Sequence, residues 1–149
     1  MKDLTLRLAT KGDVAAIVDL YAQDELSTSP KLADVAPMAE AFDEIVSDPR
    51  AFLYVATLAG RVVGTFQMNV LRYLSHAGGR VAQIEAVAVA RSLRAQGVGT
   101  EMMRFALSEA SRLGCVRAQL TSQKRRTRAH GFYERLGFER SHEGMKRKL

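Results

Sequence analysis

The stretch VAQIEAVAVA RSLRAQGVGT EMMRFALSEA, residues 81–110, decides the fold of this chain. Val81–Ala90 is apolar apart from Gln83 and Glu85, and such a run predicts a central strand that is covered on both faces. The glycine-containing turn that follows leads into a predicted helix, Gly97–Leu113, whose apolar residues recur every three or four positions. A strand, a turn and a helix in this order indicate an α/β protein.

The flanking sequence supplies further elements on both sides of this unit. Apolar periodicity predicts a helix after Thr10, a second over Val35–Val46 and a last one over Thr127–Leu136. The predicted strands are Thr5–Leu8, Phe52–Leu58, Arg61–Leu71, Val81–Ala90, Val116–Thr121, Phe138–Ser141 and Met145–Leu149. This order of elements predicts a mixed sheet with helices on both faces.

Length and composition limit the class of protein. A chain of 149 residues is expected to form one domain, 1–149. Its single cysteine, Cys115, excludes an intramolecular disulfide and a cysteine-built zinc site, and no metal is expected. The N-terminus does not resemble a secretory signal, and no apolar run approaches the roughly 20 residues that cross a bilayer. We therefore expect a cytoplasmic protein that does not bind membranes.

Charge is unevenly distributed along the chain. Residues 1–49 contain 4 Lys and Arg against 10 Asp and Glu, whereas residues 112–149 contain 11 against 3. Clustered positive charge attracts phosphate groups, so the basic C-terminal third suggests an anionic partner. A solvated basic face without a dedicated ligand is the alternative. Nucleic-acid binding is disfavoured because no aromatic platform accompanies the basic cluster 124–128.

The turn Arg94-Ala95-Gln96-Gly97-Val98-Gly99-Thr100 carries the sharpest chemical signal. Unpaired amides and the helix dipole at a helix N-terminus favour phosphate, and glycines let it approach the backbone. No Gly-Lys-Ser/Thr follows, and Met102 occupies the place of the third glycine of a dinucleotide fingerprint. The pattern predicts a diphosphate site of another kind.

A second block, Phe132-Tyr133-x-x-Leu136-Gly137-Phe138, follows at the C-terminal side. Together with Arg94-x-x-Gly97-x-Gly99 it resembles the GNAT superfamily of acetyltransferases. The resemblance implies a mixed, mostly antiparallel twisted sheet of about six or seven strands. It also implies a V-shaped splay between the fourth and fifth strands, and acetyl-CoA bound in that splay without a metal.

The resemblance also implies the cofactor contacts. The pantetheine arm is expected along the backbone of the fourth strand, with the diphosphate on the glycine turn and the 3′-phosphate near Lys124, Arg125, Arg126 or Arg128. Arg126 stands where many family members have an asparagine. The expected cofactor-binding residues are Val87, Ala88, Val89, Arg94, Ala95, Gln96, Gly97, Val98, Gly99, Thr100, Arg126, His130 and Phe132.

Two residues are candidates for catalysis. Tyr133 is expected to protonate the leaving thiolate, because a phenol with a pKa of about 10 matches a thiol with a pKa of about 8.5. Glu85 interrupts an apolar strand, shares the strand parity of Gln83, Val87 and Val89, and is a candidate general base. A packed core tyrosine and a structural ion pair remain the alternatives. Cys115 is expected to be buried rather than nucleophilic.

These features predict an N-acetyltransferase that moves an acetyl group directly to a small primary amine, such as an amino acid, a polyamine or an amine drug. Acetylation of a protein lysine or N-terminus is a second prediction. A non-catalytic acyl-CoA-binding module is a third. A homodimer is expected from the resemblance alone.

Overall fold

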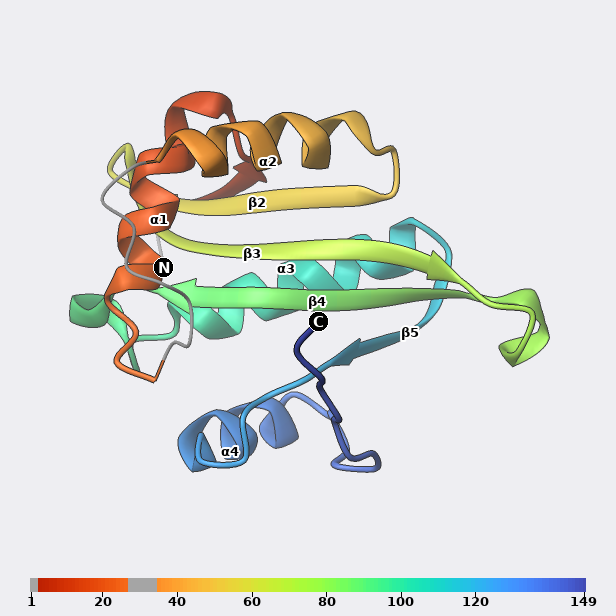
Figure 1. The fold of residues 1–149 in the computed structure, drawn as a ribbon. Coiled ribbons are helices and arrows are strands. Elements are labelled where there is room, and N and C mark those ends of the chain that lie inside the picture. The colour runs from red at the N-terminus through yellow and green to blue at the C-terminus, as the bar shows by residue number, and fades with distance from the viewer. Residues whose placement is uncertain (1–2, 27–34) are drawn as a thin grey trace.

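The computed structural model describes residues 3–26 and 35–149, which form a five-stranded sheet with helices on both faces (Figure 1). The strands lie in chain order, antiparallel except for the parallel pair β4–β5. The strands are β1 (Leu4–Leu8), β2 (Ala51–Leu58), β3 (Arg61–Arg72), β4 (Arg80–Val89) and β5 (Cys115–Leu120). The helices are α1 (Val14–Ala22), α2 (Ala36–Ser47), α3 (Val98–Arg112) and α4 (Thr127–Arg135).

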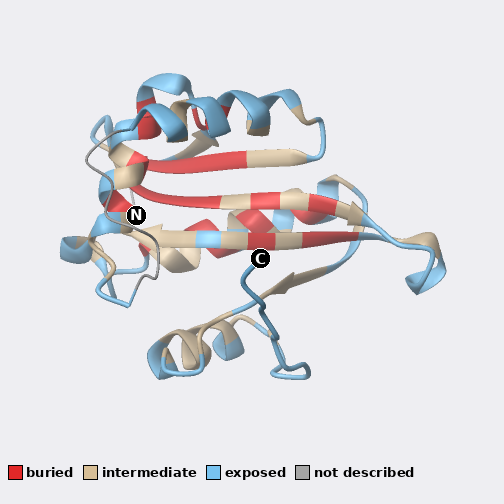
Figure 2. Cartoon of the chain, in the orientation of Figure 1, coloured by how far each residue is buried: buried red, intermediate tan, exposed pale blue. Residues whose placement is uncertain are grey.

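Each face of the sheet has its own apolar core. On one face α1 and α2 cover β2 through Ile17, Phe42 and Val55. On the other face α3 packs against the middle strands through a larger cluster that includes Phe66 and Met102. Figure 2 shows the buried residues concentrated in β2, β3, β4 and α3, while β5 and α4 are only partly covered.

A β-bulge interrupts β4 at Ala86. Gln67 of β3 pairs with Glu85, and Thr65 pairs with Ala88, so two residues of β4 lie opposite one residue of β3. Ala86 has a φ of 52°, the left-handed conformation that such a bulge uses. The extra residue reverses the alternation of side chains, because each residue inserted into a strand turns the following ones to the opposite face.

Because of the bulge, the residues of β4 that share a face of the sheet differ from those predicted from the sequence. Val87 and Val89 pack against the α3 core together with Ile84. Glu85 instead pairs with Gln67, which lines a groove between the sheet and helices α1 and α2. Glu85 therefore does not share a face with Val87 and Val89, as strict alternation along Val81–Ala90 predicted.

β4 and β5 separate along their length. Their pairing runs from Arg80 with Cys115 to Ile84 with Leu120. Beyond Ile84, the edge of β4 that faces β5 has no strand partner in the described chain, and Figure 1 shows β5 turning away toward α4. The splay predicted between the fourth and fifth strands is present.

The expected six or seven strands are wrong, because the sheet has five. Residues 138–141 and 145–149 form no strand. Met145 is 93% exposed and Leu149 is 111% exposed, so the second segment buries no apolar face that could stabilise it against the sheet. In the described part of the chain, no helix has both the length and the apolar character needed to span a bilayer.

Candidate active site

The N-terminus of α3 presents unpaired amides. The first backbone hydrogen bond of this helix runs from the Glu101 amide to the Gly97 carbonyl, at 3.0 Å. The preceding amides, those of Val98, Gly99 and Thr100, have no hydrogen-bond acceptor in the described chain. A 15-residue helix with three free amides at its positive end is suited to bind an anion.

The two glycines of the turn have different roles. Gly97 has a φ of 92° and open space where a side chain would begin, so its backbone conformation requires glycine. Gly99 has ordinary dihedrals, and a Cβ there would lie 3.4 Å from the Phe132 ring. A side chain at position 99 would therefore begin in ordinary contact with Phe132, and Phe132 shapes the wall of the site rather than lying free within it.

Arg94 fixes the turn to the rest of the fold. Its Nε donates to the Val89 carbonyl at 3.1 Å, and one terminal nitrogen donates to the Gln23 carbonyl at 3.4 Å. Ala95 has a φ of 60°, and the Gln96 side chain donates to the Ser92 carbonyl at 2.7 Å. These bonds hold the loop in a shape that leaves the α3 amides uncovered.

The open edge of β4 lies beside this loop. Val87, Ala88 and Val89 follow the point at which β5 departs, and the chain then runs directly into the turn before α3. Among these residues the Val89 carbonyl is already bonded to Arg94. An extended polar molecule could pair with the remaining edge and reach the α3 amides, as a sheet edge accepts an added strand.

Ser122 lies two residues beyond the end of β5, the strand that borders the opening. Its hydroxyl is buried at the end of β5 and makes no hydrogen bond in the described chain. A buried hydroxyl without a partner is costly and rare, so its position calls for one. The opening, the free amides and this hydroxyl together fit the pantetheine diphosphate of a coenzyme A thioester.

Tyr133 lies on the α3 side of the opening. It packs in the core cluster, with its ring 5.1 Å from that of Phe132 and 5.8 Å from that of Phe138. Burial raises the pKa of its hydroxyl above the usual 10, and the positive charge of Arg126 opposes part of this effect. Its hydroxyl makes no hydrogen bond within the described residues, so the proton is retained at neutral pH and is free for transfer.

Glu85 lies on the face of the sheet that α1 and α2 cover. Its carboxylate accepts a hydrogen bond of 2.8 Å from Gln83 Nε2, and Gln83 Oε1 accepts one of 2.7 Å from Gln119 Nε2. Glu85 forms no ion pair with a described residue. The sequence alone does not reveal Gln83 and Gln119 as partners of Glu85, although both are polar residues in otherwise largely apolar strands.

The basic residues at the start of α4 have different partners. Arg126 forms an ion pair of 2.8 Å with Asp24, and both side chains are about one-quarter exposed. Burial raises the pKa of Asp24, but hydrogen bonds from Arg126 and the Leu26 amide outweigh it and leave the pKa below its usual range. Arg125 donates to the Leu26 carbonyl, while Arg128 is exposed and makes no hydrogen bond or ion pair with the described residues.

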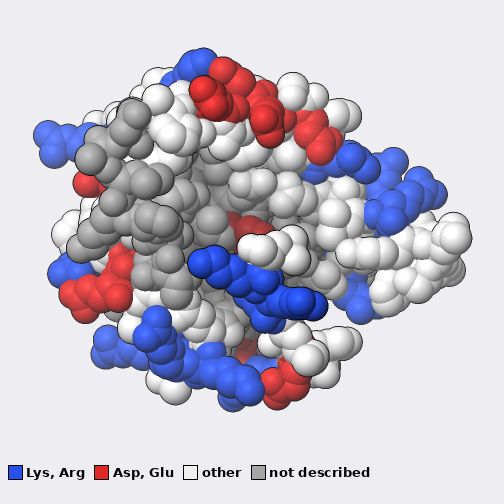
Figure 3. Space-filling view, in the orientation of Figure 1, with Lys and Arg blue, Asp and Glu red and all other residues white. Residues whose placement is uncertain are grey.

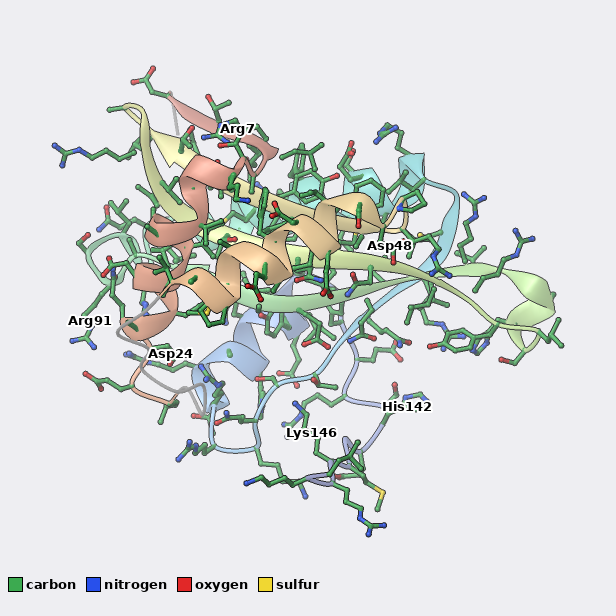
Figure 4. The ribbon with its side chains drawn as sticks, turned by 45° about the horizontal axis from the view of Figure 1, so that its top comes forward. Arg7, Asp24, Asp48, Arg91, His142 and Lys146 are labelled. Atoms are coloured by element: carbon green, nitrogen blue, oxygen red, sulfur yellow. The ribbon has the colours of Figure 1, made fainter. Side chains whose placement is uncertain are left out.

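These contacts tie the end of α1 to both sides of the opening. Arg91 bonds the Gln23 carbonyl at 3.2 Å and Glu25 at 2.7 Å from the turn before α3. Figure 4 shows Asp24 and Arg91 at one end of the molecule, with His142 and Lys146 of the C-terminal segment well away from them. In Figure 3 Lys and Arg gather around α4 and the C-terminal segment, whereas Asp and Glu gather over α2.

The three histidines make contacts within the fold. His130 is hydrogen-bonded through Nε2 to the Gln123 carbonyl at 2.9 Å, which closes the loop before α4. His76 contacts Arg117 in the loop after β3, and His142 contacts Ser141. Burial raises the pKa of the Cys115 thiol. No cluster of His, Cys, Asp and Glu suited to a metal occurs among residues 3–26 and 35–149.

Comparison with known proteins agrees with this geometry. The model of the acetyltransferase (GNAT) family matches residues 14–138. The chain is 28% identical to the aminoalkylphosphonate N-acetyltransferase of Salmonella typhimurium, over 92% of this chain and 86% of the relative. It is 31% identical to the glucosamine 6-phosphate N-acetyltransferase of Trypanosoma brucei brucei, over 97% and 95%.

A solved structure shows the same fold over its full length. A transcriptional regulator from Bacillus halodurans superposes with a TM-score of 0.92 and 36% identity, covering 98% of this chain and 99% of that one. The family match spans most of the chain and includes both sequence blocks that border the opening between β4 and β5. The chain belongs to the GNAT family of acetyltransferases, and its activity is that of an acyltransferase.

Proposed function

We propose that this protein, as one domain over residues 1–149, transfers an acetyl group from acetyl-CoA directly to the primary amine of a small molecule. The observation that carries the proposal is the separation of β4 from β5 beside the free amides of α3. The GNAT family uses acetyl-CoA, and both curated relatives are N-acetyltransferases of small amine-bearing molecules. Their names favour a small acceptor over a protein lysine or N-terminus.

The cofactor contacts follow from the same opening. The Arg94–Thr100 loop supplies amides for the diphosphate, and the edge Val87–Val89 supplies backbone groups for the pantetheine. Ser122 adds a hydroxyl. For the 3′-phosphate, Arg128 is the first choice because it is exposed and makes no hydrogen bond or ion pair with described residues, whereas Lys124 already pairs with Glu143 at 3.2 Å.

Three further residues border the same site. Arg126 lies near Tyr133 and could exchange Asp24 for a phosphate oxygen, since both side chains are partly exposed. His130 and Phe132 shape the α4 wall. A homodimer and a cytoplasmic location remain predictions from the sequence.

Glu85 and Tyr133 divide the proton transfers. Glu85 takes the proton of the acceptor ammonium, directly or through a water molecule, and so frees the nitrogen lone pair to attack the thioester carbonyl carbon. As the carbon–sulfur bond breaks, Tyr133 donates its hydroxyl proton to the sulfur. Burial keeps that hydroxyl protonated until the transfer. The products are an N-acetyl amine and the free thiol of coenzyme A.

Thiol release across a panel of primary amines tests the activity. We expect Tyr133→Phe to lower kcat about 100-fold, the usual contribution of a general acid, with little change in the KM for acetyl-CoA. Glu85→Gln should lower kcat/KM, because an amide cannot take the proton of the acceptor ammonium. Tyr73→Phe is the matched control, because Tyr73 lies in the loop after β3 against His76.

Other outcomes separate the alternatives. Acetyl-CoA that raises the melting temperature without turnover of any amine would indicate a binding module. Turnover only with peptides would indicate protein acetylation. An unchanged rate in Tyr133→Phe would refute its role as proton donor.

A further inference from the structure

An apolar groove adjoins Glu85 on the face covered by α1 and α2. Its volume is about 240 Å³, and its floor crosses from β2 to β4. Residues of α1 form one wall and residues of α2 the other. The lining residues are Val14, Ile17, Val18, Tyr21, Met38, Ala41, Phe42, Ile45, Leu53, Gln67 and Ala86.

The floor of the groove includes two neighbours of the proposed catalytic base. Ala86 directly follows Glu85 in the bulge, and Gln67 is the residue of β3 paired with Glu85. The bulge turns Glu85 to this face, where strict alternation from Val87 and Val89 would have placed it on the α3 face. Glu85 itself does not line the groove, but a ligand there would meet an apolar surface beside two neighbours of Glu85, Gln67 and Ala86.

The charges around the groove select the class of ligand. None of its described lining residues is Lys or Arg. A second depression on the sheet contains Arg50, but Arg50 is paired with Asp48 at 3.4 Å. The acidic side chains over α2, visible in Figure 3, would attract a cation toward this face. An ammonium on an apolar body therefore matches the described lining and the acidic side chains over α2.

We propose that the acceptor is a primary monoamine with an apolar body, of alkyl or arylalkyl type, whose body fills this groove while its ammonium meets Glu85. The inference rests on the proposed acetyl transfer and specifies its substrate class. This substrate class differs from the phosphorylated and phosphonylated amines in the names of the two curated relatives. Tyr21, whose buried hydroxyl contacts Thr65, would close the groove beside the base.

Matched amines provide the first test. We compare kcat/KM for 2-phenylethylamine, 2-aminoethylphosphonate and methylamine by thiol release at saturating acetyl-CoA. We expect phenylethylamine to exceed the phosphonate at least about tenfold, because an apolar body of this size is worth more than 1.4 kcal/mol on burial. A preference for the phosphonate that Arg50→Gln removes would overturn the inference and place the acceptor in the second depression.

Filling the groove provides the second test. Ala41 is exposed on its rim, so Ala41→Phe should preserve the fold and raise the KM for phenylethylamine about tenfold while leaving methylamine unchanged. Ala15→Phe is the control, because Ala15 is exposed on α1 outside the groove. Met38→Lys should likewise raise the KM for phenylethylamine, since its charge repels the ammonium.

The outcomes distinguish the two proposals. Turnover of phenylethylamine that neither Ala41→Phe nor Met38→Lys affects overturns the groove assignment and leaves acetyl transfer standing. Absence of thiol release with every amine overturns the proposed function and the acceptor assignment with it.

Discussion

Asp13 joins β1 to the start of α1 and provides a quantitative test of the structure. Its carboxylate accepts two hydrogen bonds from Arg7, at 2.7 and 2.9 Å, and two from the amide and hydroxyl of Thr10, at 2.8 and 3.0 Å. The side chain is 10% exposed. Arg7 contributes most to lowering its pKa, against the opposing effect of burial, and the pKa lies at about 2 instead of 3.8.

The magnitude follows from this difference. Since each pKa unit corresponds to roughly 1.4 kcal/mol, ionised Asp13 stabilises the folded state by about 2 kcal/mol at neutral pH. Because the folded pKa is the lower one, this stabilisation is present above pH 3.8 and is lost as the pH falls toward 2. Asp13→Asn should therefore lower the free energy of unfolding by about 2 kcal/mol near neutral pH.

Urea unfolding of both proteins, followed by circular dichroism over a pH series, measures this effect. The difference between wild type and Asp13→Asn should shrink below about pH 4. Asp43→Asn is the matched control, because the Lys11–Asp43 pair is 61% and 55% exposed and should contribute less than about 1 kcal/mol. A difference for Asp13→Asn that is absent, or that stays constant down the series, would refute the reasoning.

Two further predictions concern the loop and the thiol. Gly97→Ala should destabilise the fold by about 1 kcal/mol in urea unfolding and weaken acetyl-CoA binding, because alanine is strained at a φ of 92°. Position 99 has ordinary backbone dihedrals, and the Cβ added by Gly99→Ala would just contact Phe132. Gly99→Ala should therefore lose less stability and less acetyl-CoA affinity than Gly97→Ala, and equal losses in the two variants would contradict this reasoning. Cys115→Ser should retain acetyl transfer, measured by thiol release, because burial disfavours the thiolate. An acetylated Cys115 detected by mass spectrometry would show the opposite.

The five strands and four helices were predicted from sequence to within one or two residues at most ends, because apolar periodicity reports which side of each element is covered. The last two strands were wrongly predicted. Met145–Leu149 has apolar residues at both ends, but local pattern does not reveal whether a partner edge lies within reach, and these residues remain exposed.

The sequence by itself determined the family, the glycine loop before α3 and the two candidate catalytic residues, since these depend on residue type and spacing along the chain. Only the tertiary structure decided how Glu85 is presented. The bulge at Ala86 reverses the alternation that the linear pattern implied, and it turns Glu85 toward an apolar groove between α1 and α2. A bulge depends on the register between β3 and β4, a long-range pairing that no local window of sequence contains.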